Sequence, residues 1–160
     1  MQWHLKSFEQ LSADELYRIL EQRVNVFMLE QNCLYPEIDG KDLRSFHLFA
    51  EENGQIAAYC RLLPPGVAYD QASIGRVLVG GDFRGRGLAQ ELMTRAIAFL
   101  TEERGEREIK IQAQHYLEKF YGSLGFRPIS GVYPEDGIPH VDMLLGGTDT
   151  DAWRAGTLDG

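Results

Sequence analysis

The chain has 160 residues, of which 44% are hydrophobic, and a formal net charge of −8 at pH 7. This length suits one domain with its own core and is too short for two. Nucleic-acid binding needs clustered Lys and Arg, which are scattered here, and no apolar run approaches the roughly 20 residues of a membrane span. We therefore expect one cytoplasmic domain over residues 1–145, with no nucleic-acid or membrane partner.

The two cysteines indicate the redox compartment of the chain, and the composition of its last 15 residues indicates whether they are ordered. Cys33 and Cys60 lie far apart and lack metal-ligand spacing, so we expect reduced thiols, no disulfide and no bound metal. Residues 146–160 are polar and glycine-bearing, and they offer too little apolar surface to order themselves. We expect a flexible tail there, with Trp153 as a single aromatic that could dock it.

The N-terminal half predicts one strand, one helix and a hairpin. Residues 3–8 alternate polar with apolar, as a strand does and a signal peptide does not. Ser12 caps a helix whose apolar residues recur at helical spacing up to Phe27. A loop over 33–42 follows, and then strands over 46–51 and 55–63, joined through Asn53-Gly54, a strong hairpin signal.

The C-terminal half alternates strands with helices. We expect strands over 72–79 and 108–114, a long helix over 87–103 between them, a short helix over 116–124, and a last pair of strands over 126–133 and 140–145. The pattern predicts an α/β fold with a mixed sheet.

The clearest functional signal is the basic turn Arg84-Gly85-Arg86-Gly87, which leads from an apolar strand into an amphipathic helix. The first N–H groups of a helix have no partners inside it, and the helix dipole is positive at that end. Glycines let the backbone approach a ligand closely, and the two arginines add positive charge. We therefore expect a phosphorylated cofactor at this turn.

Two common phosphate-binding motifs do not fit the turn. It lacks the Gly-Lys-Ser/Thr ending of a P-loop. Gly85-Arg86-Gly87 is followed by Leu88-Ala89-Gln90, so the third small residue of the dinucleotide fingerprint is out of place. What the turn does match is the pattern Arg-x-x-Gly-x-Ala, from Arg84 to Ala89.

This pattern resembles the acyl-coenzyme A pyrophosphate loop of the Gcn5-related N-acetyltransferase (GNAT) superfamily. Residues 112–126, ending in Leu-Gly-Phe, resemble the strand, short helix and turn of the same superfamily, with Tyr121 at its tyrosine position. Residues 23–42, His47-Leu48 and residues 135–140 are similar to its ElaA-like branch. The resemblance implies the GNAT fold, a mixed and mostly antiparallel sheet flanked by helices, whose central strands splay to form an acyl-CoA cleft.

The resemblance also implies a cofactor site. Acetyl-CoA would be the co-substrate, without a metal, and its pantetheine arm would lie between strands 72–79 and 108–114. The residues implied to bind it are those with open peptide groups, Val77, Leu78 and Val79, those of the pyrophosphate loop, Arg84, Gly85, Arg86, Gly87, Leu88 and Ala89, and Gln114, where the superfamily usually has Asn.

Acyl transfer to an amine needs a deprotonated nucleophile, stabilisation of the tetrahedral oxyanion and a proton for the departing thiolate. Tyr121 is our candidate for the acid, because a phenol with a pKa near 10 stays protonated at neutral pH. Glu37 and His140 are our candidates for the base, since both lie in loops that would border the acceptor site.

Asp39 and Asp42 of the first loop, and His115, which falls where a strand ends near the cleft, also stay open as bases. Cys33 is rejected as a covalent acyl carrier, because an acidic loop raises the pKa of a thiol.

The functional hypothesis is transfer of an acetyl group to a primary amine of a small molecule or peptide, by direct attack in a ternary complex formed by a monomer or homodimer. Two alternatives remain. A non-catalytic acyl-CoA sensor or interaction module would bind the cofactor without turnover. A nucleotide-dependent protein would be protected against unfolding by ATP or NAD and not by coenzyme A.

Overall fold

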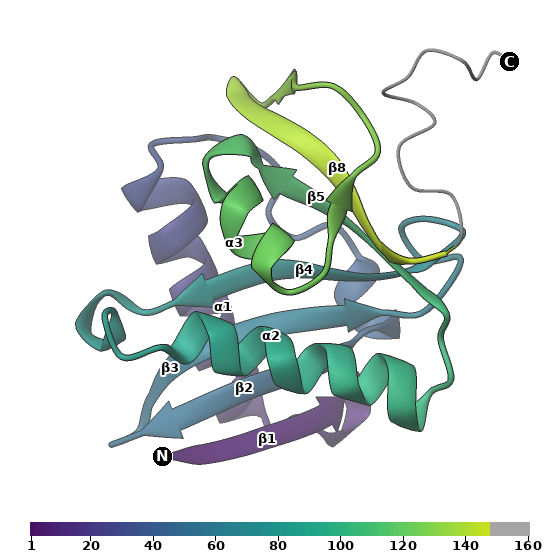
Figure 1. Cartoon of the computed structure of the whole chain (residues 1–160). Coiled ribbons are helices and arrows are strands. Elements are labelled where there is room, and N and C mark those ends of the chain that lie inside the picture. The colour runs from purple at the N-terminus through teal and green to yellow at the C-terminus, as the bar shows by residue number, and fades with distance from the viewer. Residues whose placement is uncertain (148–160) are drawn as a thin grey trace, which may run out of the picture.

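A computed structural model describes residues 1–147 of the chain (Figure 1). Its eight-stranded sheet has the order β1-β2-β3-β4-β5-β8-β6, and β7 pairs with β8. The strands are β1 (Gln2–Ser7), β2 (Phe46–Glu52), β3 (Gln55–Leu63), β4 (Ala72–Val79), β5 (Glu108–Gln114), β6 (Arg127–Pro128), β7 (Tyr133–Glu135) and β8 (Ile138–Gly146). The α-helices are α1 (Ala13–Arg23), α2 (Leu88–Ala98) and α3 (Glu118–Ser123). Strands β4 and β5 pair in parallel and the other pairs are antiparallel, so the mixed sheet is confirmed.

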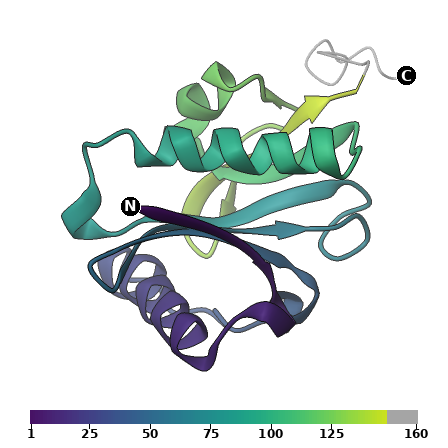
Figure 2. The ribbon, with the colours of Figure 1, turned by 90° about the horizontal axis from the view of Figure 1, so that it is seen from below.

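Helices cover both faces of the sheet, with α1 on one face and α2 and α3 on the other (Figure 2). Strand β3 is buried along nearly its whole length and serves both faces. Its Tyr59 packs with Ile19 of α1, whereas its Cys60 packs in the larger core with Leu92 of α2. None of the helices within residues 1–147 is long and apolar enough to cross a membrane.

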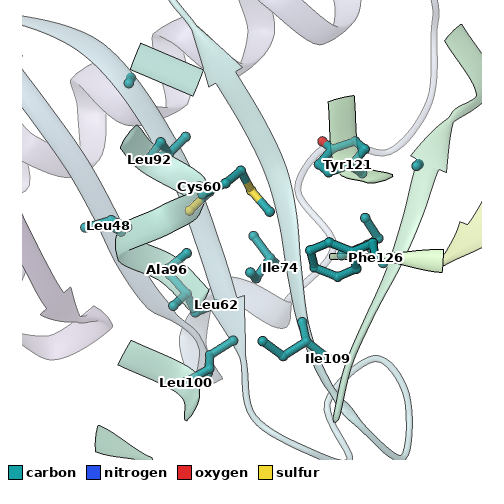
Figure 3. Packing of buried hydrophobic residues seen from close by; sticks show 14 of the residues in the cluster. Leu48, Cys60, Leu62, Ile74, Leu92, Ala96, Leu100, Ile109, Tyr121 and Phe126 are labelled. Atoms are coloured by element: carbon teal, nitrogen blue, oxygen red, sulfur yellow. The ribbon is translucent and has the colours of Figure 1, made fainter. Parts of the chain in front are cut away.

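The larger core brings the two halves of the chain together. Figure 3 shows Ile74 of β4 between Ala96 of α2 and the aromatic pair Tyr121 and Phe126. The apolar residues of α2 recur at helical spacing, which is why one face of the helix is buried against the sheet. The core thus fixes β4 against α2 and against the segment that carries Tyr121.

Most elements lie where the sequence predicts them. The predicted bounds of β3, β4 and β5 agree with the structure. Ser12 caps α1, and its Oγ accepts the N–H of Glu15 at 3.0 Å. Both long helices continue into wider, π-helical turns, over Val24–Glu30 after α1 and over Phe99–Glu103 after α2.

The prediction of one strand over 126–133 is wrong, because the chain there forms two short strands, β6 and β7. The N–H of Ile129 still bonds to the carbonyl of Asp142 at 2.9 Å, but the N–H of Asp142 on β8 bonds at 2.9 Å to the hydroxyl of Ser130 instead of to a strand carbonyl, so the ladder ends there. Strand β7 then forms a hairpin with β8 through Asp136-Gly137, whose φ angles are +53° and +77°. Gly146, the first residue of the expected tail, is instead the last residue of β8. Residues 148–160 of that tail, with Trp153, lie outside the described residues.

Candidate active site

Strands β4 and β5 separate after a short parallel contact. They pair through Ala72 and Ser73 of β4 and no further along that strand. On its other side β4 stays paired with β3 up to Val79. One edge of β4 over Val77–Val79 is therefore without a strand partner in the described part of the chain, and such an edge offers N–H and C=O groups to a ligand.

A β-bulge in β4 lies where this separation begins. Two steps along β3, from Tyr59 to Arg61, correspond to three steps along β4, from Leu78 to Gly75. Within the bulge Arg76 has φ +51°, in the left-handed region that residues with a Cβ rarely adopt. A bulge bends its strand and increases the local twist, which turns β4 away from β5.

The gap between the strands opens into a cavity of about 980 Å³. Six of the ten predicted cofactor residues line it, namely Val77, Leu78, Val79, Arg84, Ala89 and Gln114, whereas Gly85, Arg86, Gly87 and Leu88 do not. Tyr121 lines the same cavity from α3. The Gln114 amide donates to Oε1 of Gln31 at 3.2 Å, and both residues face the cavity.

Two loops far apart in the sequence also line the cavity. One contributes Tyr35, Pro36 and Asp39, and the β7–β8 hairpin contributes Glu135, Asp136, Ile138 and His140. The two loops meet at Cys33, whose Sγ lies 3.6 Å from the carbonyl oxygen of Asp136. The structure thus brings both acidic loops to the cavity that the predicted cofactor residues line.

The glycine-rich turn is shaped for close approach. Gly85 and Gly87 have φ +82° and +75°, and within residues 1–147 no atom beyond the adjoining backbone lies within 4 Å of where a Cβ would stand on either residue. Gly87 is the N-cap of α2, so the free N–H groups from Leu88 onward point out of the helix at this turn. Glycine therefore supplies the backbone conformation and leaves the space in front of it open.

Both arginines of the turn form exposed ion pairs. Arg84 donates through Nη2 to Glu30 at 2.7 Å and through Nε to the carbonyl of Val79 at 3.1 Å. Arg86 bonds to Glu52 at 3.1 Å. Solvent-exposed pairs of this kind are weak, so a phosphate could take their place at low cost.

Tyr121 is held by aromatic contacts rather than by its hydroxyl. Its ring meets those of Phe120 and Phe126 edge-on, at centroid distances of 5.1 and 6.1 Å. The residue is 7% exposed, and its hydroxyl has no hydrogen bond to any residue that the structure describes. Burial raises the pKa of Tyr121 above its ordinary value, so the phenol is protonated at neutral pH.

His140 is held in one tautomer. Its Nδ1 lies 2.7 Å from the carbonyl oxygen of Ile138, which can only accept a hydrogen bond, so in the neutral ring Nδ1 carries the proton. The ring stacks on Tyr133 at a centroid distance of 6.4 Å. This arrangement leaves the lone pair of Nε2 available to accept a proton.

Glu37 lies behind the cavity wall. Its side chain is 3% exposed, and Oε2 accepts from Nε of Arg23 at 2.6 Å and from Nε of Arg76 at 2.8 Å. The hydroxyl of Tyr35 donates to Oε1. Both carboxylate oxygens thus have partners inside the protein, and Glu37 does not line the cavity, so this placement favours a structural role for Glu37 over that of a base.

Asp39 and Asp42 belong to the same buried cluster of charges. Asp39 pairs with Arg61 at 2.7 Å, and Asp42 pairs with Arg23 at 2.7 Å and with Arg61 at 3.0 Å. Burial by itself would raise the pKa of Asp39, but the hydrogen bonds from Arg61 outweigh it and hold this pKa below its usual range. His115, the remaining candidate, lies 3.5 Å from Glu118 and is not on the cavity wall.

The open edge of β4, the bulge and the glycine-rich helix start, all around one cavity, define an acyl-CoA-dependent acyltransferase fold. Residues 11–146 match the family described as "Acetyltransferase (GNAT) domain". The chain therefore belongs to the GNAT family, and this family takes its acyl group from acyl-CoA.

The relatives place the chain within the family. It is 37% identical over 145 residues to Protein ElaA of Escherichia coli, which covers 89% of this chain and 95% of that protein. A UPF0039 protein of Schizosaccharomyces pombe is 41% identical over 142 residues, covering 88% and 93%. A crystal structure described as an acyl-CoA N-acyltransferase from Pseudomonas aeruginosa is 38% identical, with a TM-score of 0.86 over 91% of this chain and all of that one. The crystal structure of E. coli ElaA has a TM-score of 0.85 at 36% identity, over 90% of this chain and 98% of that one. The resemblance to the ElaA-like branch and the GNAT fold are confirmed.

Proposed function

We propose that this protein transfers the acetyl group of acetyl-CoA to a primary amine of a small molecule or peptide, by direct attack in a ternary complex. One observation carries the proposal. A single cavity is lined by the open edge of β4, by Arg84 and Ala89 at the two ends of the glycine-rich turn, and by Tyr121 and His140.

In this proposal the cofactor is bound mainly by backbone groups. The pyrophosphate accepts hydrogen bonds from N–H groups between Gly85 and Ala89, and the pantetheine arm bonds to the open edge of Val77–Val79. Arg84 and Arg86 add charge after exchanging their carboxylate partners. The thioester is thereby fixed beside the acceptor wall, and fixing two reactants in attack geometry can lower a barrier by several kcal/mol.

His140 is our proposed base. Nε2 takes a proton from the ammonium form of the acceptor, and the neutral nitrogen attacks the thioester carbonyl carbon. The C–N bond forms, N–H groups of the β4 edge stabilise the oxyanion, and the C–S bond then breaks. The tautomer held by Ile138 supports this role, because it keeps the accepting lone pair on Nε2.

Tyr121 is our proposed acid, giving its hydroxyl proton to the coenzyme A thiolate as the C–S bond breaks. The attacking nitrogen loses its second proton to water, which leaves a neutral amide, and the tyrosinate regains a proton from water. Burial raises the pKa of this tyrosine, which by itself makes it a weaker donor. A thiolate released into the same desolvated pocket becomes more basic for the same reason. The two effects offset each other, and the proton transfer stays near balance.

The acceptor side supports an amine that arrives protonated. Glu135 and Asp136 face the cavity, and neither forms an ion pair with a described residue. Carboxylates at a cavity mouth attract a cationic substrate. We also propose a cytoplasmic location, which the unpaired thiols of Cys33 and Cys60 support.

A thermal-shift scan with acetyl-CoA, coenzyme A, ATP and NAD, followed by a thiol-release screen across amines, tests the proposal. We expect stabilisation by acetyl-CoA and coenzyme A alone, and amine-dependent thiol release. Stabilisation without release from any amine would identify a sensor, and stabilisation by ATP or NAD would identify a nucleotide-dependent protein.

The base is tested with a matched pair of variants. His140→Gln should lower kcat/KM for the amine and leave the acetyl-CoA affinity unchanged. His115→Gln removes a histidine that does not line the cavity and should change neither quantity. Equal effects of both substitutions, or none from His140→Gln, would remove His140 from the mechanism.

A further inference from the structure

The side chain of Arg76 connects the cofactor strand to the acceptor-side loop. Its Nε donates to Oε2 of Glu37 at 2.8 Å, and its Nη2 reaches the Glu37 carbonyl at 3.2 Å and Oδ2 of Asp39 at 3.5 Å. The guanidinium also lies over the ring of Tyr35, 5.4 Å from its centroid. One side chain of β4 therefore contacts three residues of the loop.

This loop depends on side chains for its position. Residues 33–40 form neither helix nor strand, so no ladder of backbone hydrogen bonds fixes them. Three arginines hold the loop instead, each from a different element: Arg23 from α1, Arg61 from β3 and Arg76 from β4. Of the three, Arg76 joins the loop to β4, the strand whose open edge faces the cavity.

The backbone at Arg76 points to the importance of its side chain. A φ of +51° is unfavourable for any residue with a Cβ, and glycine adopts it without that penalty. The Arg76 side chain is 20% exposed, and its guanidinium makes a charge-assisted hydrogen bond to a carboxylate that is itself buried. Such bonds are stronger than those between neutral groups. The contacts with the loop therefore offset an unfavourable backbone conformation.

We propose that Arg76 is a positioning residue for acyl transfer. Its guanidinium fixes the wall formed by Tyr35, Pro36 and Asp39 against β4, so that an amine on that wall lies at attack distance from the thioester held by β4. This inference rests on the proposed function. It assigns to Arg76 no contact with the reacting atoms.

The test compares two substitutions with a matched control. Arg76→Gly removes every side-chain contact and keeps a residue that favours positive φ, so the bulge should persist. Arg76→Lys keeps the charge but has a single ammonium, which cannot reproduce the fork of a guanidinium. Arg95→Ala is the control, because Arg95 also pairs with a carboxylate, that of Glu91 at 2.9 Å, and also lies over a ring, that of Trp3, but outside the cavity.

Three readouts separate a positioning role from a merely structural one: hydrogen–deuterium exchange of the peptide over residues 33–42, acetyl-CoA affinity by calorimetry, and steady-state kinetics with an amine substrate. For Arg76→Gly we expect exchange over 33–42 to rise about tenfold while α2 is unaffected. The acetyl-CoA Kd should stay within about twofold of wild type, while kcat/KM for the amine falls about tenfold or more. For Arg76→Lys, both the exchange over 33–42 and kcat/KM should lie between those of wild type and those of Arg76→Gly. Arg95→Ala should match wild type in all three readouts.

Unchanged exchange over 33–42 in Arg76→Gly would overturn the inference, as would a loss of acetyl-CoA affinity as large as the loss in kcat/KM. The exchange readout needs no turnover. If wild type acylates no amine, the proposed function fails, whereas exchange still decides whether Arg76 holds the loop.

Discussion

Replacing Tyr121 with phenylalanine removes one hydroxyl from the cavity wall and keeps the ring contacts with Phe120 and Phe126. Since that hydroxyl bonds to no described residue, the substitution leaves no described buried partner unpaired. The free energy of unfolding should therefore stay within about 1 kcal/mol of wild type. If the hydroxyl protonates the thiolate, kcat should fall about 10²-fold or more, which corresponds to about 2.7 kcal/mol in activation free energy.

Thiol release at saturating amine measures kcat for Tyr121→Phe, and calorimetry with acetyl-CoA and a thermal melt show whether binding and folding are preserved. Tyr116→Phe is the matched control, because Tyr116 lines the same cavity and is 74% exposed; its kcat should not change. An unchanged kcat in Tyr121→Phe would refute the proposal that Tyr121 is the acid that protonates the thiolate. A loss of stability that parallels the loss of kcat would instead mean that the hydroxyl makes a buried structural hydrogen bond.

Three further predictions concern the cofactor turn, the charge cluster and the core. Gly87→Asp should weaken acetyl-CoA binding by at least about tenfold, because it puts a negative side chain at the phosphate site. Gly105→Asp is the control, at a position with a similar φ of +71° and equally open space, and it should leave this affinity unchanged. Equal losses of affinity in both variants would point to backbone strain. The pKa of Asp39 is depressed in the fold, so its contribution to stability is present above the unfolded pKa of about 3.9 and is lost as the pH falls toward the folded value; acid melts should show this loss in wild type and a smaller one in Asp39→Asn, and identical slopes would contradict the pairing with Arg61. Leu92→Ala, at a fully buried position of α2, should cost about 2–5 kcal/mol in chemical denaturation, and a cost under about 1 kcal/mol would be inconsistent with this core.

The elements that the sequence predicts well are those bounded by local turn chemistry. Asn53-Gly54 forms the two-residue turn between β2 and β3, and Glu52 and Gln55 on either side of it are paired. The β7–β8 hairpin carries an equivalent signal in Asp136-Gly137, which lies between residues 126–133 and 140–145 and marks where β7 ends. The predicted strand is interrupted because the Ser130 hydroxyl takes the N–H of Asp142 in place of a strand carbonyl, and serine side chains can compete with a ladder in this way.

The charge cluster could be predicted only in part. Arg23 lies four residues after Ile19 and three before Val26, on the buried stripe of its helix, so its spacing indicates a buried cation. Its partners Glu37 and Asp42 come from a loop whose path depends on tertiary contacts, and no local pattern shows which carboxylates turn inward. The same gap explains why Glu37 seemed from sequence to be a candidate base. The bulge at Arg76 was also hidden, because a left-handed arginine has no sequence signature of its own.

In the proposed function, the cavity between β4 and β5 is where an amine receives an acetyl group from acetyl-CoA. The most direct test incubates the protein with acetyl-CoA carrying ¹³C in its acetyl group and a mixture of amines, and follows the label by mass spectrometry. We expect a labelled amide and free coenzyme A from wild type, less of both from Tyr121→Phe, and little of either from Gly87→Asp. Tight binding of acetyl-CoA with no labelled amide from any amine would contradict the proposed function.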